Sequence, residues 1–376
     1  MSRPVPKEVE IAVAGGSIAG LCAGNALLSA GFDVHLFERS AQRLSSRGAG
    51  IVVQPELLNL LKSVDARPLA TTGCTVRRTF VASTGQVETI SMPQRFTSWE
   101  AIYSSLRSSF PDHRYHSGNE LTLEAQSASG VNIWSGNDRI EADLLIAADG
   151  IRSRFRAALA PDTITSYSGY VAWRGVVNET ELDPDLVEHF DDTFSFCQAT
   201  GGGHALCYFI PGSDLATERG RRRLNWVWYI HVDHGPALDR LLTDKSGRRR
   251  DTSVPQGEIS DNMRDFLLAH TGALTEAFAR LVEATPDPFL QSIIDVVPSG
   301  MVFGRVCLIG DAAFVLRPHT AAAAAKAAAD AMALAHALRG TEGDFDHRLS
   351  AWERQRTAIG RQLVKYGVML GDRAQT

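Results

Sequence analysis

The chain has 376 residues, of which 44% are hydrophobic and 22% charged, and its formal net charge is −5. This length exceeds what one hydrophobic core usually covers, so we expect two lobes or one domain with a large insertion. The negative charge argues against nucleic acid as a main partner, and no apolar run is long enough to span a bilayer, so no membrane partner is expected.

The cysteines and the N-terminal stretch indicate the compartment. Five widely spaced cysteines contain no CxxC pair, and Met1–Glu10 is polar and leads straight into an expected strand. Such a pattern is typical of free thiols in a reducing setting and shows no signal peptide. We therefore expect a cytoplasmic protein, and no metal site is predicted.

The first elements form a βαβ unit with a dinucleotide fingerprint. Glu10–Ala14 is an apolar strand, a helical pattern runs to Ala30, and Val34–Phe37 forms a second strand that ends at Glu38. Glycines permit the tight turn, the helix N-terminus faces a pyrophosphate, and Glu38 accepts from a ribose hydroxyl. An acid at this position favours NAD or FAD. The turn itself consists of Gly15, Gly16, Ser17, Ile18, Ala19 and Gly20, with Ser17 in place of the second glycine.

The next segments do not continue as a plain NAD domain, which would keep alternating strands and helices. A Gly-rich turn at Gly50 leads into a short extended segment, and Val76–Ile90 resembles a β-meander. A helix follows from about Trp99 to Phe110. An antiparallel pair then precedes an apolar strand that ends on Asp149-Gly150.

The region Tyr167–Val297 changes character and is read as a second lobe. Its aromatic-rich segments alternate like the strands of an antiparallel sheet: Gly169–Val177, Thr193–Gln198, His204–Ile210 and Leu224–Val232. Ser260–Glu283 is predicted as a helix. Val306–Ile309 is predicted as a buried strand that ends at Gly310-Asp311, and Pro318 fixes φ near the start of a helix over Ala321–Leu338.

Three motifs in this order resemble the single-component FAD-dependent aromatic hydroxylases: the fingerprint, Asp149-Gly150…Ser153…Arg156, and Gly310-Asp311…Pro318. The resemblance covers nearly the whole chain. It implies an α/β fold, in which a Rossmann-like FAD-binding domain holds an inserted antiparallel-sheet (α+β) substrate domain and ends in a C-terminal helix. The expected FAD-binding domain comprises 1–75, 96–165 and 298–345, the substrate domain 76–95 and 166–297, and the helix 346–376.

The resemblance also implies the cofactor and the reaction. FAD is expected as the bound cofactor, with NADH or NADPH as a transient electron donor and O2 as co-substrate. The reaction would be hydroxylation of an aromatic ring through a flavin C4a-hydroperoxide. Besides the fingerprint, the residues predicted to contact the cofactor are Glu38, Arg39, Gly50, Val52, Arg107, Asp149, Gly310, Asp311, Ala321 and Ala322.

Further segments, among them Arg317-Pro318-His319-Thr320 and Trp173-Arg174-Gly175-Val176, resemble the hydroxypyridine-hydroxylating members of this class. They imply a hydroxypyridine-like or phenolic substrate. Histidine is the plausible base because its pKa lies near the working pH, so His319 and His204 are the catalytic candidates. The predicted substrate-binding residues are Tyr208, Trp228, Phe314, Arg317 and Pro318.

Two alternatives stay open at this point. Phe314 stands where the broad family often has histidine, and Ala321–Ala325 contain none of the usual glycines. Because of these departures, the alternative hypothesis is a flavin-binding protein of the same fold that has lost hydroxylase activity and serves a binding or regulatory role. A NAD-linked dehydrogenase would require ignoring both Asp149-Gly150 and Gly310-Asp311. The oligomeric state is left open, with a homodimer as one option.

Overall fold

The computed structural model describes residues 10–42, 44, 50–341 and 343–375. In the described part of the chain, one lobe is built on a six-stranded sheet with the order β17-β18-β10-β1-β2-β6. Strands β1, β2, β10 and β18 run parallel, and Val13 of β1 lies between Leu36 and Ile146. The strands are β1 (Glu10–Ala14), β2 (Asp33–Glu38), β6 (Tyr115–Ser117), β10 (Leu144–Ala147), β17 (Val302–Phe303) and β18 (Val306–Leu308).

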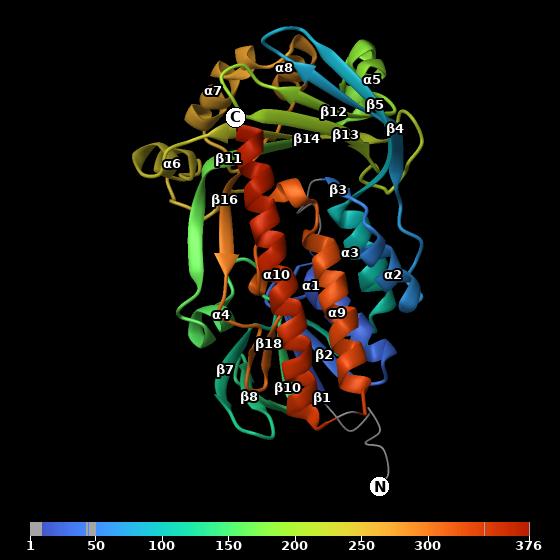
Figure 1. Cartoon of the computed structure of the whole chain (residues 1–376), viewed down its shortest axis with the longest axis vertical. Coiled ribbons are helices and arrows are strands. Elements are labelled where there is room, and N and C mark those ends of the chain that lie inside the picture. The colour runs from blue at the N-terminus through green and yellow to red at the C-terminus, as the bar shows by residue number, and fades with distance from the viewer. Residues whose placement is uncertain (1–9, 43, 45–49, 342, 376) are drawn as a thin grey trace.

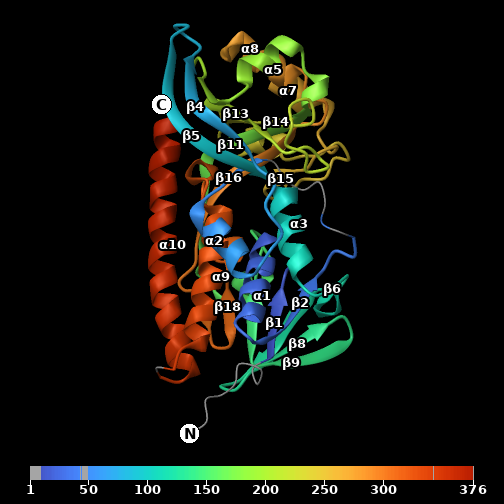
Figure 2. The ribbon, with the colours of Figure 1, turned by 90° about the vertical axis from the view of Figure 1, so that its right-hand side faces the viewer.

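Helices cover this parallel sheet in successive layers. Helix α1 (Ile18–Ser29) is buried along most of its length because it lies between the sheet and α9 (Ala323–Arg339). Figure 2 shows α10 (Phe345–Gln375) outside α9, and α1 between α9 and the strands. The remaining elements of this lobe are α2 (Pro55–Ser63), α3 (Trp99–Ser109), α4 (Arg154–Leu159), β7 (Leu121–Gln126), β8 (Val131–Ser135) and β9 (Asp138–Ala142).

The second lobe is a mixed sheet with the order β15-β16-β11-β14-β13-β12-β4-β5-β3, nine strands within the described residues. Figure 1 shows it above the parallel sheet, with α5, α7 and α8 on its far side. The strands are β3 (Gly50–Val52), β4 (Thr72–Val81), β5 (Val87–Ser98), β11 (Ile164–Asn178), β12 (Thr193–Gln198), β13 (His204–Ile210), β14 (Arg223–His231), β15 (Ser253–Val254) and β16 (Phe289–Val297). The helices are α5 (Pro184–Phe190), α6 (Pro236–Leu241), α7 (Asp261–Ala269) and α8 (Glu276–Glu283).

The two faces of this sheet carry different residues because side chains alternate along each strand. Trp173, Trp226 and Trp228 lie in a core that includes Phe278 of α8, so they face the helices. Tyr170 and Tyr229 belong to a separate cluster on the opposite face. We call this opposite face the roof face, because it lies toward the parallel-sheet lobe.

The structure confirms the expected α/β fold, corrects the bounds of two predicted helices and adds one strand. The helix predicted over Ser260–Glu283 is divided into α7 and α8 by the 3₁₀ turn Thr271–Ala273. Helix α9 begins at Ala323, because Pro318–Thr320 form a separate 3₁₀ turn and Ala321 has a φ of 50°. Strand β16 was not predicted. Among the described helices, none combines the length and apolarity needed to cross a bilayer.

Candidate active site

The fingerprint turn is shaped by backbone contacts that leave no room for side chains. Gly15 has a φ of 108°, and a Cβ there would lie 2.4 Å from the carbonyl oxygen of Ala148. A Cβ on Gly20 would lie 1.8 Å from the carbonyl oxygen of Gly15, so this glycine lets α1 approach the turn. The main-chain N–H of Gly16 donates to Oε2 of Glu38 over 2.7 Å. The turn and the acid at the end of β2 are therefore held as one unit.

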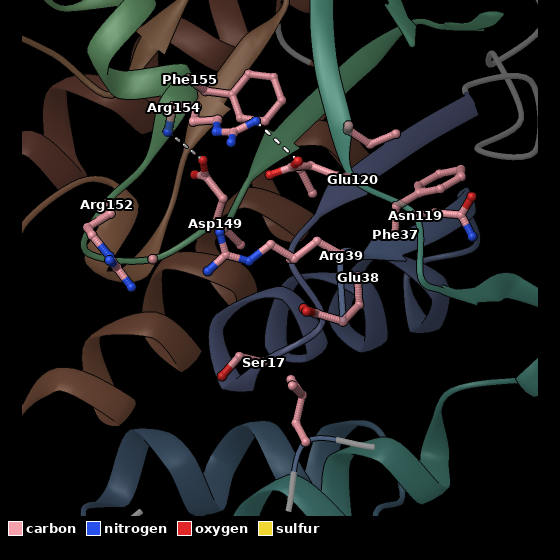
Figure 3. A pocket seen from close by; sticks show the side chains of 16 residues that line it. Ser17, Phe37, Glu38, Arg39, Asn119, Glu120, Asp149, Arg152, Arg154 and Phe155 are labelled. Atoms are coloured by element: carbon pink, nitrogen blue, oxygen red, sulfur yellow. Dashed lines mark hydrogen bonds and ion pairs between the residues drawn. The ribbon is translucent and has the colours of Figure 1, made fainter. Parts of the chain in front are cut away.

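A cleft opens at the carboxyl ends of β1, β2 and β10, where ligands bind in open α/β sheets (Figure 3). Five of the residues predicted to contact the cofactor line this cleft: Gly15, Ser17, Glu38, Arg39 and Asp149. The lining residues are Ala14, Gly15, Ser17, Phe37, Glu38, Arg39, Leu44, Asn119, Glu120, Leu121, Ala148, Asp149, Gly150, Arg152, Arg154 and Phe155. The arrangement suits a nucleotide whose phosphates lie at the N-terminus of α1.

Asp149 presents a carboxylate oxygen that the described residues do not use. Its Oδ2 accepts from the main-chain N–H of Arg154 over 2.8 Å, which fixes the side chain at the start of α4. Its Oδ1 is buried and has no hydrogen-bond partner among the described residues. A buried acceptor without a donor is costly, so Oδ1 is matched to a hydroxyl donor of a ligand in the cleft.

The second acidic motif lies against the same helix. A Cβ on Gly310 would lie 2.5 Å from Cβ of Ala19, so the 3₁₀ turn Gly310–Ala312 packs directly on α1. Arg156 donates to the carbonyl oxygens of Asp311 and Ala312, each over 3.0 Å. Burial raises the pKa of the Asp311 carboxyl, and the charges of Lys326 and Arg156 oppose that shift. The three motifs read in the sequence thus meet at one end of α1.

These features fit FAD. The cleft supplies an acid for a ribose and glycine backbone for a pyrophosphate, and Asp149 and Asp311 offer acceptors for hydroxyl groups. The roof face then closes the space above the turn Pro318–Thr320. Residues Glu38, Asp149 and Asp311 are therefore the side chains that would hold the cofactor.

His319 lies in an aromatic cluster between the two lobes. Its Nε2 is 3.0 Å from the hydroxyl oxygen of Tyr170 on β11. Its ring centroid is 4.3 Å from that of Tyr229 on β14 and 5.3 Å from that of His204 on β13. The two predicted histidines are thus brought together although 115 positions separate them in the sequence. We call His204, His319, Tyr170 and Tyr229 the histidine cluster.

The histidine cluster keeps His319 uncharged. Burial, followed by the charges of His204, Arg317 and Arg174, lowers the pKa of His319 from 6.5 to about 3. Burial also raises the pKa of Tyr170, so its hydroxyl stays protonated at neutral pH. A neutral imidazole can accept a proton, whereas an imidazolium cannot.

Three predicted substrate residues are engaged elsewhere, although one of them, Arg317, also adjoins Tyr170. Trp228 faces the helix-side core, because it shares a strand face with Trp226. Phe314 lies in the core of the first lobe, where a Cβ on Gly360 of α10 would lie 2.5 Å from its ring. Arg317 donates to Asp295 over 2.8 Å and to Asp372 over 2.9 Å, so two carboxylates already occupy its guanidinium. The structure corrects all three assignments.

The other predicted residues lie near the space between the lobes. Tyr208 is on the roof face and stacks on Phe96 at 4.2 Å, and the backbone of Gly50 lies against its ring. Val52 packs against that same small core, and Pro318 precedes His319 in the 3₁₀ turn. For these residues the substrate and cofactor roles stay predictions.

The predicted cofactor residues Ala321, Ala322 and Arg107 occupy two different places. Ala321 and Ala322 connect the 3₁₀ turn to α9, and Nε2 of Gln54 donates to the carbonyl oxygen of Ala321 over 2.9 Å. Arg107 lies in the last turn of α3, with its guanidinium 4.2 Å from the centre of the Tyr115 ring. Tyr115 in turn donates to the carbonyl oxygen of Gly16 over 3.2 Å, which connects Arg107 to the fingerprint indirectly. Cofactor contact by these residues also stays a prediction.

Several residues at this site were not singled out as site residues in the sequence. Tyr170, Tyr229 and Asn225 lie on the roof face, and Gln54 holds the loop after His319. Strand alternation carried a signal for Tyr229, since it occupies the face opposite to Trp226 and Trp228. Nothing in the local sequence pointed to Gln54, because its contact joins segments 267 positions apart.

The fold and the site define a class: a two-lobed dinucleotide-binding flavoprotein in which a second sheet faces the turn Pro318–Thr320. Comparison with known proteins gives the family. A family model described as FAD binding domain-like matches residues 167–295. The chain is 37% identical to 2,6-dihydroxypyridine 3-monooxygenase of Paenarthrobacter nicotinovorans, over 98% of this chain and 92% of that protein.

Further relatives agree. The 6-hydroxynicotinate 3-monooxygenase of Pseudomonas fluorescens is 26% identical, over 90% of this chain and 85% of that protein. The solved structure of 2,6-dihydroxypyridine-3-hydroxylase from Arthrobacter nicotinovorans superposes with a TM-score of 0.92 at 36% identity, covering 98% of this chain and 93% of that one. The chain belongs to the family of FAD-dependent aromatic-ring monooxygenases, with FAD as cofactor and NAD(P)H as electron donor. These findings do not favour the alternative of a protein that has lost hydroxylation.

Proposed function

We propose that the substrate is a hydroxylated N-heteroaromatic ring of the hydroxypyridine type, which binds between the roof face and the turn Pro318–Thr320. The histidine cluster is the observation that carries this proposal. It brings two histidines and two tyrosines together where the turn Pro318–Thr320 meets the roof face. Flat aromatic walls with a few polar atoms suit a small, flat, polar ring.

The protein's own contribution is binding, orientation and proton handling. When bound, FAD supplies the oxygen-activating redox chemistry, with electrons from NAD(P)H. Glu38, Asp149 and Asp311 would anchor the cofactor at hydroxyl groups. The roof face and the 3₁₀ turn Pro318–Thr320 cover the reacting edge, and covering a reactive site prevents loss of the oxidant to water.

We assign the role of proton acceptor to His319. In the tautomer in which Nε2–H donates to the hydroxyl oxygen of Tyr170, Nδ1 carries the lone pair and would accept the proton of a ring hydroxyl. Removing that proton makes the ring richer in electrons and therefore more reactive toward an electrophilic oxygen. The low pKa of His319 describes the protein without ligand, and an anion formed beside the imidazole would raise it.

The test is a screen of hydroxypyridines and simple phenols with the FAD-loaded protein. We expect one or more hydroxypyridines to stimulate NADH or NADPH oxidation, with a product heavier by one oxygen atom. Phenols without a ring nitrogen should be poorer substrates. Stimulated oxidation that yields only hydrogen peroxide, for every hydroxypyridine tried, would contradict the proposal.

We also propose a reducing, cytoplasmic setting. Its support is that all five cysteines are buried free thiols. We also propose that the chain divides into an FAD-binding domain and a substrate domain near the predicted boundaries, with β3 and the start of β4 in the sheet of the substrate domain, and that the protein is a homodimer. Size-exclusion chromatography with light scattering tests the oligomeric state, and limited proteolysis tests the boundaries.

A further inference from the structure

Two hydrogen-bond donors on the roof face are buried without acceptors. They are Nε of Arg174 on β11 and Nδ2 of Asn225 on β14, and neither has a partner among the described residues. Asn225 is completely buried. Because an unpaired buried donor costs free energy of folding, such groups call for an explanation, and a missing ligand is one that also explains their position.

The orientation of the Asn225 amide is fixed by its other contact. The main-chain N–H of Gly50 lies 2.7 Å from Oδ1 of Asn225. A backbone N–H can only donate, so the atom facing it must be the amide oxygen. The NH2 group is therefore the one that faces away from Gly50 and lacks an acceptor.

Arg174 adds a positive charge to the same face. It lies two residues from Ala172, which belongs to the cluster of Tyr170 and Tyr229, so strand alternation places it on the roof face. Its charge acts to lower the pKa of His319, Tyr208 and Tyr229, so it lies near all three side chains. No described carboxylate forms a salt bridge with Arg174, in contrast to Arg317, which has two.

The positive charge of Arg174 therefore has no described anion beside it. Arginine stays protonated in proteins, and His319 beside it is neutral. Tyr208 and Tyr229 also stay uncharged, because burial raises the pKa of both hydroxyls. A buried cation is normally paired, so the ligand that belongs here carries negative charge or a strong acceptor.

We propose that Arg174 and Asn225 form an oxyanion-binding pair that holds the deprotonated ring oxygen of the substrate. This inference rests on the proposed function, since it names the ionisation state in which the hydroxypyridine is bound. The ring O–H bond breaks, its electron pair stays on the oxygen, and the proton passes to Nδ1 of His319 and from there to solvent. Arg174 and Asn225 then donate to that oxygen.

The pair also gives a basis for substrate selection. A ring with an ionisable hydroxyl satisfies both donors, whereas an unsubstituted pyridine leaves both unpaired. A site built on buried donors discriminates strongly against a ligand that lacks the matching acceptor. Selection would thus depend on the oxygen as much as on the ring.

The experiment measures ligand binding to the oxidised FAD-loaded enzyme without an electron donor, so that no turnover occurs. 2,6-Dihydroxypyridine is titrated under anaerobic conditions. The flavin absorbance change gives Kd, and the ultraviolet band of the ligand shows whether it is bound as the anion. Arg174→Gln and Asn225→Asp are compared with the wild type and with Arg280→Gln, which removes a half-buried arginine on α8 that pairs with Asp183 and Asp185 and controls for loss of one positive charge.

We expect Arg174→Gln to raise Kd at least tenfold, as the loss of a hydrogen bond to a charged group predicts, and to shift the ionisation of the bound ligand to higher pH. Asn225→Asp keeps an acceptor for Gly50 but replaces the donor by a carboxylate, so it should weaken binding by at least as much. Arg280→Gln should match the wild type. FAD content and melting temperature show whether each variant is folded, and Arg174→Lys, which keeps the charge, should retain part of the binding.

The outcomes separate this inference from the proposed function. If hydroxypyridines are hydroxylated while both variants bind them as tightly and in the same ionisation state as the wild type, the oxyanion pair is wrong and the proposed function stands. If they bind in a manner that depends on Arg174 but are not hydroxylated, the proposed function is wrong and the pair stands. If the wild type binds none of them, both are wrong.

Discussion

The cofactor cleft and the roof face differ in how the chain builds them. The cleft is made of contiguous motifs, in which backbone N–H groups and glycines at the ends of parallel strands set the shape. The roof face is made of single side chains that alternate along β11, β13 and β14. The cleft can hold the same cofactor in many proteins, whereas the chemical character of the roof face changes with each point substitution.

This difference teaches where specificity resides. A backbone site recognises phosphates and sugars, which every FAD presents alike. Side chains on a sheet face can be exchanged without disturbing the hydrogen bonds between strands. We therefore expect changes in the cleft to abolish cofactor binding, and changes on the roof face to alter substrate binding while FAD is retained.

The largest effect is expected from Gly15→Ala. The new Cβ would lie 2.4 Å from the carbonyl oxygen of Ala148, at a φ of 108° that L-residues rarely adopt. The variant should lose FAD and about 2 kcal/mol or more of unfolding free energy. Flavin absorbance per protein and urea unfolding measure both losses.

Gly136→Ala is the matched control for that variant. Gly136 also has a positive φ, of 61°, but its Cβ would meet nothing within 4 Å. We expect about 1 kcal/mol of destabilisation from backbone strain alone, with FAD retained. Equal losses in the two variants would show that strain, and not the close approach to β10, explains the effect at Gly15.

The second prediction concerns the two histidines. His319→Gln should lower kcat about 100-fold, as expected for loss of a proton acceptor, while FAD remains bound. His204→Gln should lower it by about tenfold or less, because His204 lies farther from the cofactor loop. Tyr170→Phe removes only the hydroxyl hydrogen-bonded to Nε2 of His319. It serves as the control for loss of this hydrogen bond while the imidazole is kept. An equal or larger loss in His204→Gln would overturn the assignment of His319.

The third prediction is a dependence of stability on pH. Because burial lowers the pKa of His319 to about 3, the unfolded chain binds a proton that the folded chain does not, between about pH 6.5 and 3. The unfolding free energy should therefore fall as pH falls through this window, by up to about 1.4 kcal/mol per pH unit. His319→Gln should flatten this slope in urea unfolding at several pH values, and an unchanged slope would show that His319 is not buried as a neutral group.

The smallest effect is expected at Ala321. This residue has a φ of 50°, a left-handed conformation that costs an alanine about 1 to 2 kcal/mol. Ala321→Gly should relieve the strain and raise the unfolding free energy by about 0.5 to 1 kcal/mol, after allowing for the greater freedom of glycine in the unfolded chain. A rise in melting temperature with unchanged FAD content would support this, and a fall would contradict it.

The sequence allowed the fold to be predicted because its signals are local. A strand, a glycine turn and an acid within about 30 residues define the first βαβ unit, and the structure has it as predicted. His319 and His204 were also singled out as candidates, since each has a position next to a recognisable motif or strand, but their proximity was not predicted. The division of α7 from α8 and the start of α9 were less accessible, because the 3₁₀ turn Thr271–Ala273 and the left-handed conformation of Ala321 leave no clear residue pattern.

The substrate assignments failed where a tertiary contact decides the direction of a side chain. Trp226 and Trp228 have the aromatic character of pocket residues, but the helices α7 and α8 cover their face of the sheet. Arg317 has the charge expected of an anion site, yet Asp295 and Asp372 lie far away in the sequence and neutralise it. Arg174 has no such partner, and only the structure distinguishes the two arginines.

The ion pair between Arg317 and Asp372 has a practical consequence for anyone who prepares the protein. Arg317 precedes the 3₁₀ turn of His319, and Asp372 lies in the last turns of α10, beside the upper sheet in Figure 1. A disturbance of the last turns of α10 would reach the turn of His319 through this ion pair and through the close packing of Gly367 and Gly371 on Arg317. Fusions are better placed at the amino end, because β1, the first described strand, lies in the other lobe.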